Sequence, residues 1–76
     1  MLEDKKQQIE INIKNKYNLD ENASKILDNI LTYAIGNAFM VGYEDTKEFL
    51  LFMLDGVVEE KGTLDIMHTL FGGIEN

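Results

Sequence analysis

The side chains that could do chemistry in this sequence are one histidine, one serine and fourteen carboxylates, with no cysteine among them. Asp65 and His68 stand three residues apart, a spacing at which two side chains of a helix can face the same metal ion. Zinc sites usually take three or four nitrogen or sulfur ligands, and a single histidine without cysteine cannot supply them. We therefore expect no metal and no other cofactor.

The single serine, Ser24, does not indicate a nucleophile. A catalytic serine needs a base within hydrogen-bond reach and a pocket that stabilises the oxyanion, and the only histidine stands 44 residues away in the sequence. The pair Gly72-Gly73 does not indicate a phosphate loop, because no further helix follows it. The residue types thus favour a protein that is not an enzyme.

The carboxylates themselves form the more informative pattern. Glu48, Asp55 and Glu59 are spaced so that, on one continuous helix, Asp55 and Glu59 lie within about 20° of Glu48. Such a stripe is either a solvated surface that keeps a small protein soluble or a site that docks on a basic partner, with a nearby aromatic residue as the apolar anchor. The predicted partner-binding residues are Glu44, Asp45, Glu48, Phe52, Asp55, Glu59 and Glu60.

The charge balance favours the second interpretation. The net charge is −7, the chain has no arginine, and residues 17–76 hold eleven acids against three lysines. Phosphate contacts come mainly from Lys and Arg, and arginine is the usual bidentate reader of guanine. We therefore expect no direct contact with nucleic acid. An anionic surface of this kind suits a basic protein surface as its partner.

Small residues recur at four-residue spacing along one predicted helix face, at Ala34, Ala38 and Gly42. Small side chains allow two helices to approach closely. One interpretation is packing against the next helix of the same chain, which a short connection favours. The alternative is a seam between two copies in a homodimer.

The elements that must position these residues are helices, so the predicted fold class is all-α, a single domain over residues 1–76. The apolar periodicity predicts three main helices at 3–17, 21–42 and 46–61, followed by a short C-terminal helix at 64–71. Asp20 is the predicted N-cap of the second helix. We predict a break at Gly42, where a C-cap glycine precedes Asp45 and Glu48, and an end of the third helix at Gly62.

The predicted core draws on the second to fourth helices. The run from Phe49 to Leu54 is apolar on all sides, which is typical of a buried helix. The first helix has the narrowest apolar stripe and is expected to be mobile or ordered by a partner. The predicted core residues are Ile26, Ile30, Leu31, Ala34, Phe49, Phe52, Met53, Val57, Leu64, Met67 and Leu70.

No apolar run approaches the ~20 residues that a membrane span requires, and the polar N-terminus does not resemble a secretory signal. We expect a cytoplasmic protein without a membrane partner. The hypothesis is an acidic protein–protein interaction module, such as a small phage or bacterial inhibitor that imitates nucleic acid and binds a nuclease or a nucleic-acid-binding protein. The alternative is a structural homo-oligomer without a nucleic-acid-related partner.

Overall fold

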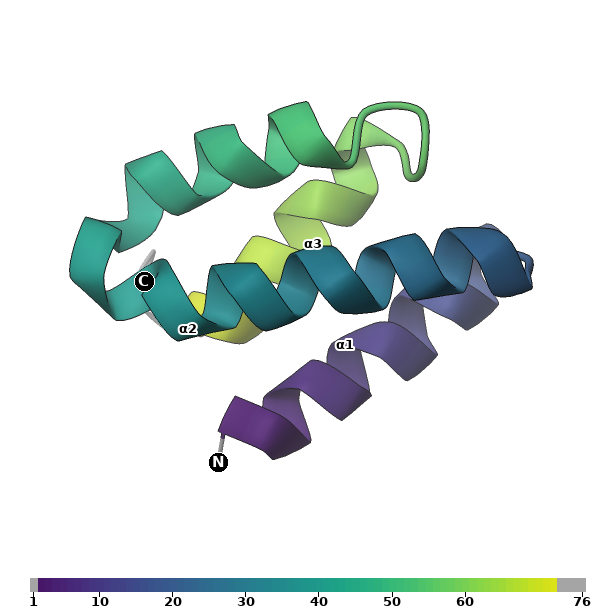
Figure 1. Cartoon of the computed structure of the whole chain (residues 1–76), viewed down its shortest axis with the longest axis horizontal. Coiled ribbons are helices and arrows are strands. Elements are labelled where there is room, and N and C mark those ends of the chain that lie inside the picture. The colour runs from purple at the N-terminus through teal and green to yellow at the C-terminus, as the bar shows by residue number, and fades with distance from the viewer. Residues whose placement is uncertain (1, 73–76) are drawn as a thin grey trace.

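The computed structural model describes residues 2–72, which form three helices packed around one core (Figure 1). The helices are α1 (Leu2–Tyr17), α2 (Glu21–Met53) and α3 (Glu60–Phe71), and no strand occurs among residues 2–72. The all-α prediction is confirmed. The predicted count of three main helices plus a short fourth is wrong for the described residues, because the two central predicted helices are parts of α2.

A tight turn joins α1 to α2. Asn18 has a positive φ of 54°, and the N–H of Leu19 donates to the carbonyl of Lys14 at 3.1 Å, which closes the end of α1. The side chain of Asp20 then accepts from the N–H of Ala23 at 2.8 Å. This bond satisfies one of the free amides of the first turn of α2. The predicted N-cap is therefore confirmed.

The long helix α2 bends back on itself at Gly42. This residue has φ 87° and ψ −179°, a conformation open essentially to glycine alone. The bend divides α2 into a first arm (residues 21–41) and a second arm (residues 43–53), which Figure 1 shows side by side. The break predicted at Gly42 is confirmed.

The second arm ends earlier than predicted. The helix expected at 46–61 stops at Met53, and the carbonyl of Leu54 accepts from the N–H groups of Val57 and Val58 in a turn that contains Gly56 at φ 84°. Gly62, the predicted terminator, lies buried in the first turn of α3. The helix expected at 64–71 is thus the later part of α3, and Gly73, which follows Gly72, lies outside the described residues.

All three helices contribute to the core. The narrow apolar stripe of α1 predicts a helix that is mobile or ordered by a partner, whereas Ile9 and Ile13 of α1 are among the most buried side chains of the chain's own core. The all-round apolar run 49–54 is buried only at Leu50 and Leu54. The second arm lies at the surface and has one inward face, whereas the prediction was a helix buried centrally or at an interface. Four predicted core residues are exposed: Ile26 on the first arm, Phe52 and Met53 on the second arm, and Leu64 on α3.

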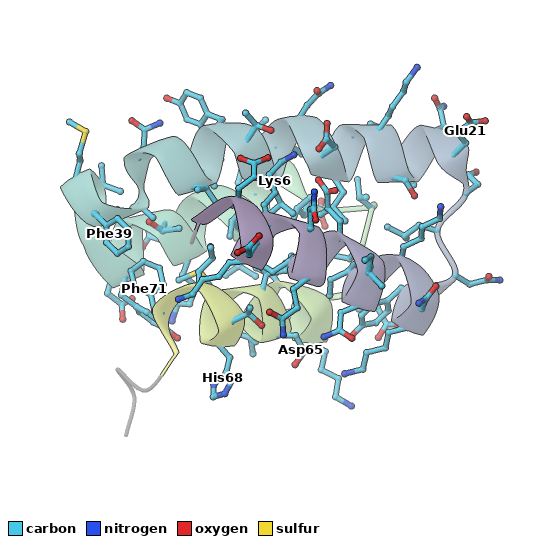
Figure 2. All side chains as sticks on the ribbon, turned by 90° about the horizontal axis from the view of Figure 1, so that it is seen from below. Lys6, Glu21, Phe39, Asp65, His68 and Phe71 are labelled. Carbon is cyan, nitrogen blue, oxygen red and sulfur yellow. The ribbon has the colours of Figure 1, made fainter. Side chains whose placement is uncertain are left out.

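Aromatic contacts join the bend of α2 to the end of α3. The ring of Phe71, at the end of α3, meets Tyr43 at 5.3 Å and Phe39 at 6.5 Å, both edge-on. Figure 2 shows Phe39 and Phe71 at the same end of the molecule. These contacts bind the bend of α2 to the last turn of α3 and so stabilise the hairpin formed by its two arms.

Candidate functional site

The second arm carries an acidic face made of Glu44, Asp45, Glu48 and Phe52. At 100° per residue these four positions fall within an arc of about 100°, and all four side chains are exposed. The face points outward because Thr46, Leu50 and Leu54 occupy the inward side of the same segment. Phe52 is 80% exposed, so its ring lies among carboxylates with most of its surface in water.

The other three predicted partner-binding residues do not share that helix. Asp55 lies in the turn after the second arm, Glu59 is the N-cap residue of α3, and Glu60 lies in its first turn. The predicted stripe of Glu48, Asp55 and Glu59 along one helix is therefore wrong, because the helix ends at Met53 before the stripe can continue. All three side chains are nevertheless exposed. Figure 1 places their turn at the far end of the second arm.

Little positive charge compensates these acids. Glu44 has an ion pair with Lys47 at 3.6 Å. Of the six predicted partner-binding acids, the other five have no ion pair within residues 2–72, and other lysines are engaged elsewhere, as Lys6 is with Asp28 and Lys16 with Asp65. Residues 43–60 hold six acids and one lysine, so the second arm and the following turn carry an excess of negative charge. The five acids are Asp45, Glu48, Asp55, Glu59 and Glu60.

A groove between the two arms adjoins the acidic face, and sequence reasoning missed it. Tyr33 and Val41 of the first arm face Thr46 and Phe49 of the second arm across it, with Asp45 on its lining. The rings of Tyr33 and Phe49, one from each arm, lie 5.2 Å apart. The break at Gly42 was a usable signal, because a sharp bend brings the residues on either side of it face to face.

The predicted dimer seam lies inside the single chain. Ala34 and Ala38 are buried, and Gly42 forms the bend. Their small size lets the second arm and α3 pack closely onto the first arm, as in the intramolecular interpretation. A second copy of the chain could reach these two alanines only if the packing of the arms opened.

A second, more polar groove lies between α1 and α3, with a volume of about 220 Å³. Asn12 and Lys16 of α1 face Asp65, His68 and Thr69 of α3. Lys16 Nζ lies 2.7 Å from Asp65 Oδ2, and this hydrogen bond and the opposite charge raise the pKa of Lys16 above its ordinary value. The amine is thereby held as an ammonium ion, which cannot act as a nucleophile.

The other residues weighed for catalysis are not brought into a catalytic arrangement. Among residues 2–72, no group of three His, Cys, Asp or Glu side chains lies close enough to hold a metal ion. The Oγ of Ser24 is buried without a hydrogen-bond partner, so no base contacts it. His68 lies on α3, whereas Ser24 lies on α2. Figure 2 shows the side chain of His68 projecting outward from α3.

One carboxylate pair does have its pKa values moved apart. Lys6 Nζ lies 2.5 Å from Asp28 Oδ1 and 3.3 Å from Glu10 Oε2, which ties α1 to α2. Burial and the hydrogen bond to Asp28 raise the pKa of Glu10, while the hydrogen bonds from Glu10 and Lys6 lower the pKa of Asp28. Lys6 pairs with Glu10 on its own helix and with Asp28 across the interface between α1 and α2, so we interpret the cluster as a structural connection.

Comparison with protein-family models, with curated proteins and with solved structures gives no match for this chain. Each helix in the described part of the chain is too short or too polar to cross a lipid bilayer.

Proposed function

We propose that this protein is a non-enzymatic interaction module that binds a basic surface on another protein. The observation that carries the proposal is the acidic face: an exposed aromatic ring, Phe52, on the same helix face as three carboxylates, of which only Glu44 has an ion pair with a lysine. Asp55, Glu59 and Glu60 extend the same negative surface beyond the second arm. Charge would steer the partner, and the apolar ring would supply the buried contact.

The class of partner follows from the charge. Carboxylates presented along one helix offer a basic surface the same sign of charge as a phosphate backbone. A protein whose own ligand is nucleic acid therefore fits best, and the chain would act by occupying that ligand's place. This proposal makes the chain an inhibitor of a nuclease or of another nucleic-acid-binding protein.

The second candidate is a structural homo-oligomer, which the large exposed apolar side chains favour. Phe39 and Met40 stand exposed just before the bend, in addition to Phe52 on the second arm. Analytical ultracentrifugation distinguishes the two candidates. A monomer that persists at low micromolar concentration contradicts the oligomer, and a tight dimer that buries Phe52 contradicts the inhibitor.

Affinity capture with defined variants tests the first candidate. The immobilised chain is compared with the variant Asp45→Asn/Glu48→Gln, and with the control Glu3→Gln/Glu21→Gln, which removes the same charge from exposed positions on α1 and the start of α2. Proteins bound specifically should be basic, should be lost from the first variant, and should be kept by the control.

Salt and competition complete the test. Binding should weaken strongly between about 0.05 M and about 0.5 M salt, because exposed charges are screened over that range. The captured protein should also be released by double-stranded nucleic acid. Capture that is equal for the chain and for Asp45→Asn/Glu48→Gln, and indifferent to salt, contradicts the proposal.

A further inference from the structure

The groove between the two arms of α2 has the size of one large apolar side chain. Its volume is about 180 Å³. An apolar cavity of about 150 Å³ is large enough to take a benzene ring. The bend at Gly42 turns the second arm back along the first, so that residues of both arms line this space.

The groove is largely apolar and open to solvent at its rim. Tyr33 and Val41 line it from the first arm and Phe49 lines it from the second, with the ring centroids of Tyr33 and Phe49 5.2 Å apart. The side chain of Tyr33 is 60% exposed and that of Val41 is 48% exposed. An apolar group entering the groove would therefore remove both its own surface and part of these side chains from water, which favours binding.

Thr46 lines the groove and leaves a polar group unsatisfied in the free protein. The residue is 2% exposed, and its Oγ1 has no hydrogen-bond partner among residues 2–72. A buried hydroxyl without a partner costs free energy. Because this hydroxyl makes no hydrogen bond in the described part of the chain, an apolar side chain that enters the groove breaks none at Thr46.

Charge at the rim selects the occupant. Asp45 lines the groove, Glu48 follows one turn later on the acidic face, and neither has an ion pair in the described part of the chain. A second copy of this chain, at a net charge of −7, would bring like charges to the same rim. The complementary ligand carries lysine or arginine on either side of its apolar side chain.

We propose that this groove binds a phenylalanine or leucine side chain of the partner, set between basic residues in one segment of its chain. The inference rests on the proposed function and adds to it the contact that gives specificity. The acidic face attracts the basic segment, and the groove distinguishes a segment with an apolar anchor from one that is merely basic.

Two synthetic peptides with blocked ends test the groove: Lys-Lys-Phe-Lys-Lys and Lys-Lys-Ala-Lys-Lys. Each is titrated into the full chain, and amide shifts in nitrogen–proton spectra give both the dissociation constant and the residues affected. The phenylalanine peptide should bind at least about fivefold more tightly, from the burial of its ring. Its shifts should include the amides of Asn37 and Thr46.

Single substitutions measure the contribution of the groove to peptide binding separately from that of the acidic face. Tyr33→Ala removes an exposed ring that lines the groove, and Val41→Phe fills part of the groove with a larger side chain, so that either change should bring the two peptides to nearly equal affinity. Ile11→Ala, which removes an exposed apolar side chain from α1, is the matched control and should preserve the difference. Circular dichroism verifies that each variant is folded.

The outcomes distinguish this inference from the proposed function. If both peptides bind equally and both weaken in Asp45→Asn/Glu48→Gln, the groove proposal is wrong and the acidic face remains the site. If both peptides bind Asp45→Asn/Glu48→Gln as tightly as they bind the native chain, the charge-based function is wrong. The groove proposal, which rests on that function, is then wrong as well. A phenylalanine preference that survives both Tyr33→Ala and Val41→Phe places the anchor elsewhere and also overturns the inference.

Discussion

Gly62 of α3 lies directly against the ring of Tyr17 of α1. A Cβ added at Gly62 would lie 3.0 Å from Tyr17 Cε2 and 3.2 Å from Val58 Cβ, closer than side chains normally pack. The absence of a side chain at this position lets the end of α1 approach the start of α3. The glycine that the sequence pattern assigned to a helix end is therefore part of a helix–helix contact.

This contact predicts opposite effects for two similar substitutions. Gly36→Ala, at an exposed helical position with nothing within 4 Å of the new Cβ, should raise the free energy of unfolding by about 0.5–1 kcal/mol. In Gly62→Ala the same helical gain is outweighed by overpacking, which costs about 1–3 kcal/mol. We expect a net loss of about 1 kcal/mol, measured by urea denaturation. Equal stabilisation by both substitutions would mean that Tyr17 and Val58 move aside freely.

Gly42→Ala tests the bend of α2. The space around this residue is open, so the loss should come from its backbone alone, which has φ 87° and ψ −179°. Forcing a residue with a Cβ into this conformation costs about 1–3 kcal/mol. Urea denaturation should show that loss for Gly42→Ala, whereas Gly36→Ala on the same helix should not lose stability. A variant that keeps full stability would show that α2 can bend without glycine.

The sequence predicted the fold class well because local signals agreed with the tertiary structure. Asp20 capped α2 and Gly42 broke it as expected, since both effects act within a few residues. The end of the second arm was missed because Gly56 and Gly62 are equally plausible helix ends in sequence. Only the packing of Tyr17 against Gly62 decides between them.

The candidate site was predicted only in part, again because the sequence indicates what lies within a few residues and not what tertiary packing decides. Glu44, Asp45, Glu48 and Phe52 share a face because they lie within one short helical segment. Extending that face to residues 55–60 required a helix that the turn at Gly56 ends. The groove could not be found from periodicity, because it depends on how far apart the bend leaves Val41 and Phe49.

Thr46→Val should stabilise the protein. The hydroxyl of Thr46 is buried without a hydrogen-bond partner, and valine fills nearly the same volume without that polar group. We expect a gain of about 1 kcal/mol in the free energy of unfolding. The matched control is Thr69→Val, because the hydroxyl of Thr69 donates to the carbonyl of Asp65 at 3.1 Å and its loss should bring no such gain. A loss of stability in Thr46→Val would indicate that this hydroxyl is hydrogen-bonded in solution.

Phe52→Ser should separate binding from stability. The ring is 80% exposed, so its removal should change the free energy of unfolding by less than about 0.5 kcal/mol. If Phe52 is an anchor for the partner, the same substitution should weaken binding at least about tenfold, as hot-spot residues do. The comparison is Ile11→Ser, which changes another exposed apolar residue on α1. Equal binding by both variants would remove Phe52 from the site.

The cluster of Glu10, Asp28 and Lys6 predicts a pH-dependent stability with a definite sign. Burial raises the pKa of Glu10, so the folded state holds this proton more tightly than the unfolded state does. The contribution of Glu10 is therefore complete below its unfolded pKa and is lost as the pH rises through its raised pKa. Asp28 has a lowered pKa and contributes in the opposite direction, losing its effect as the pH falls through that value.

Glu10→Gln isolates the first of these effects. Glutamine keeps a hydrogen-bond donor for Asp28 but cannot ionise, so the variant should be about as stable as the native chain at acidic pH and more stable at neutral pH. Urea denaturation over a pH series measures the difference, and Glu3→Gln, at an exposed position of α1, controls for the lost negative charge. A variant that is less stable at neutral pH would contradict this, because it would show that the ion pair of Glu10 with Lys6 outweighs the cost of burying the carboxylate.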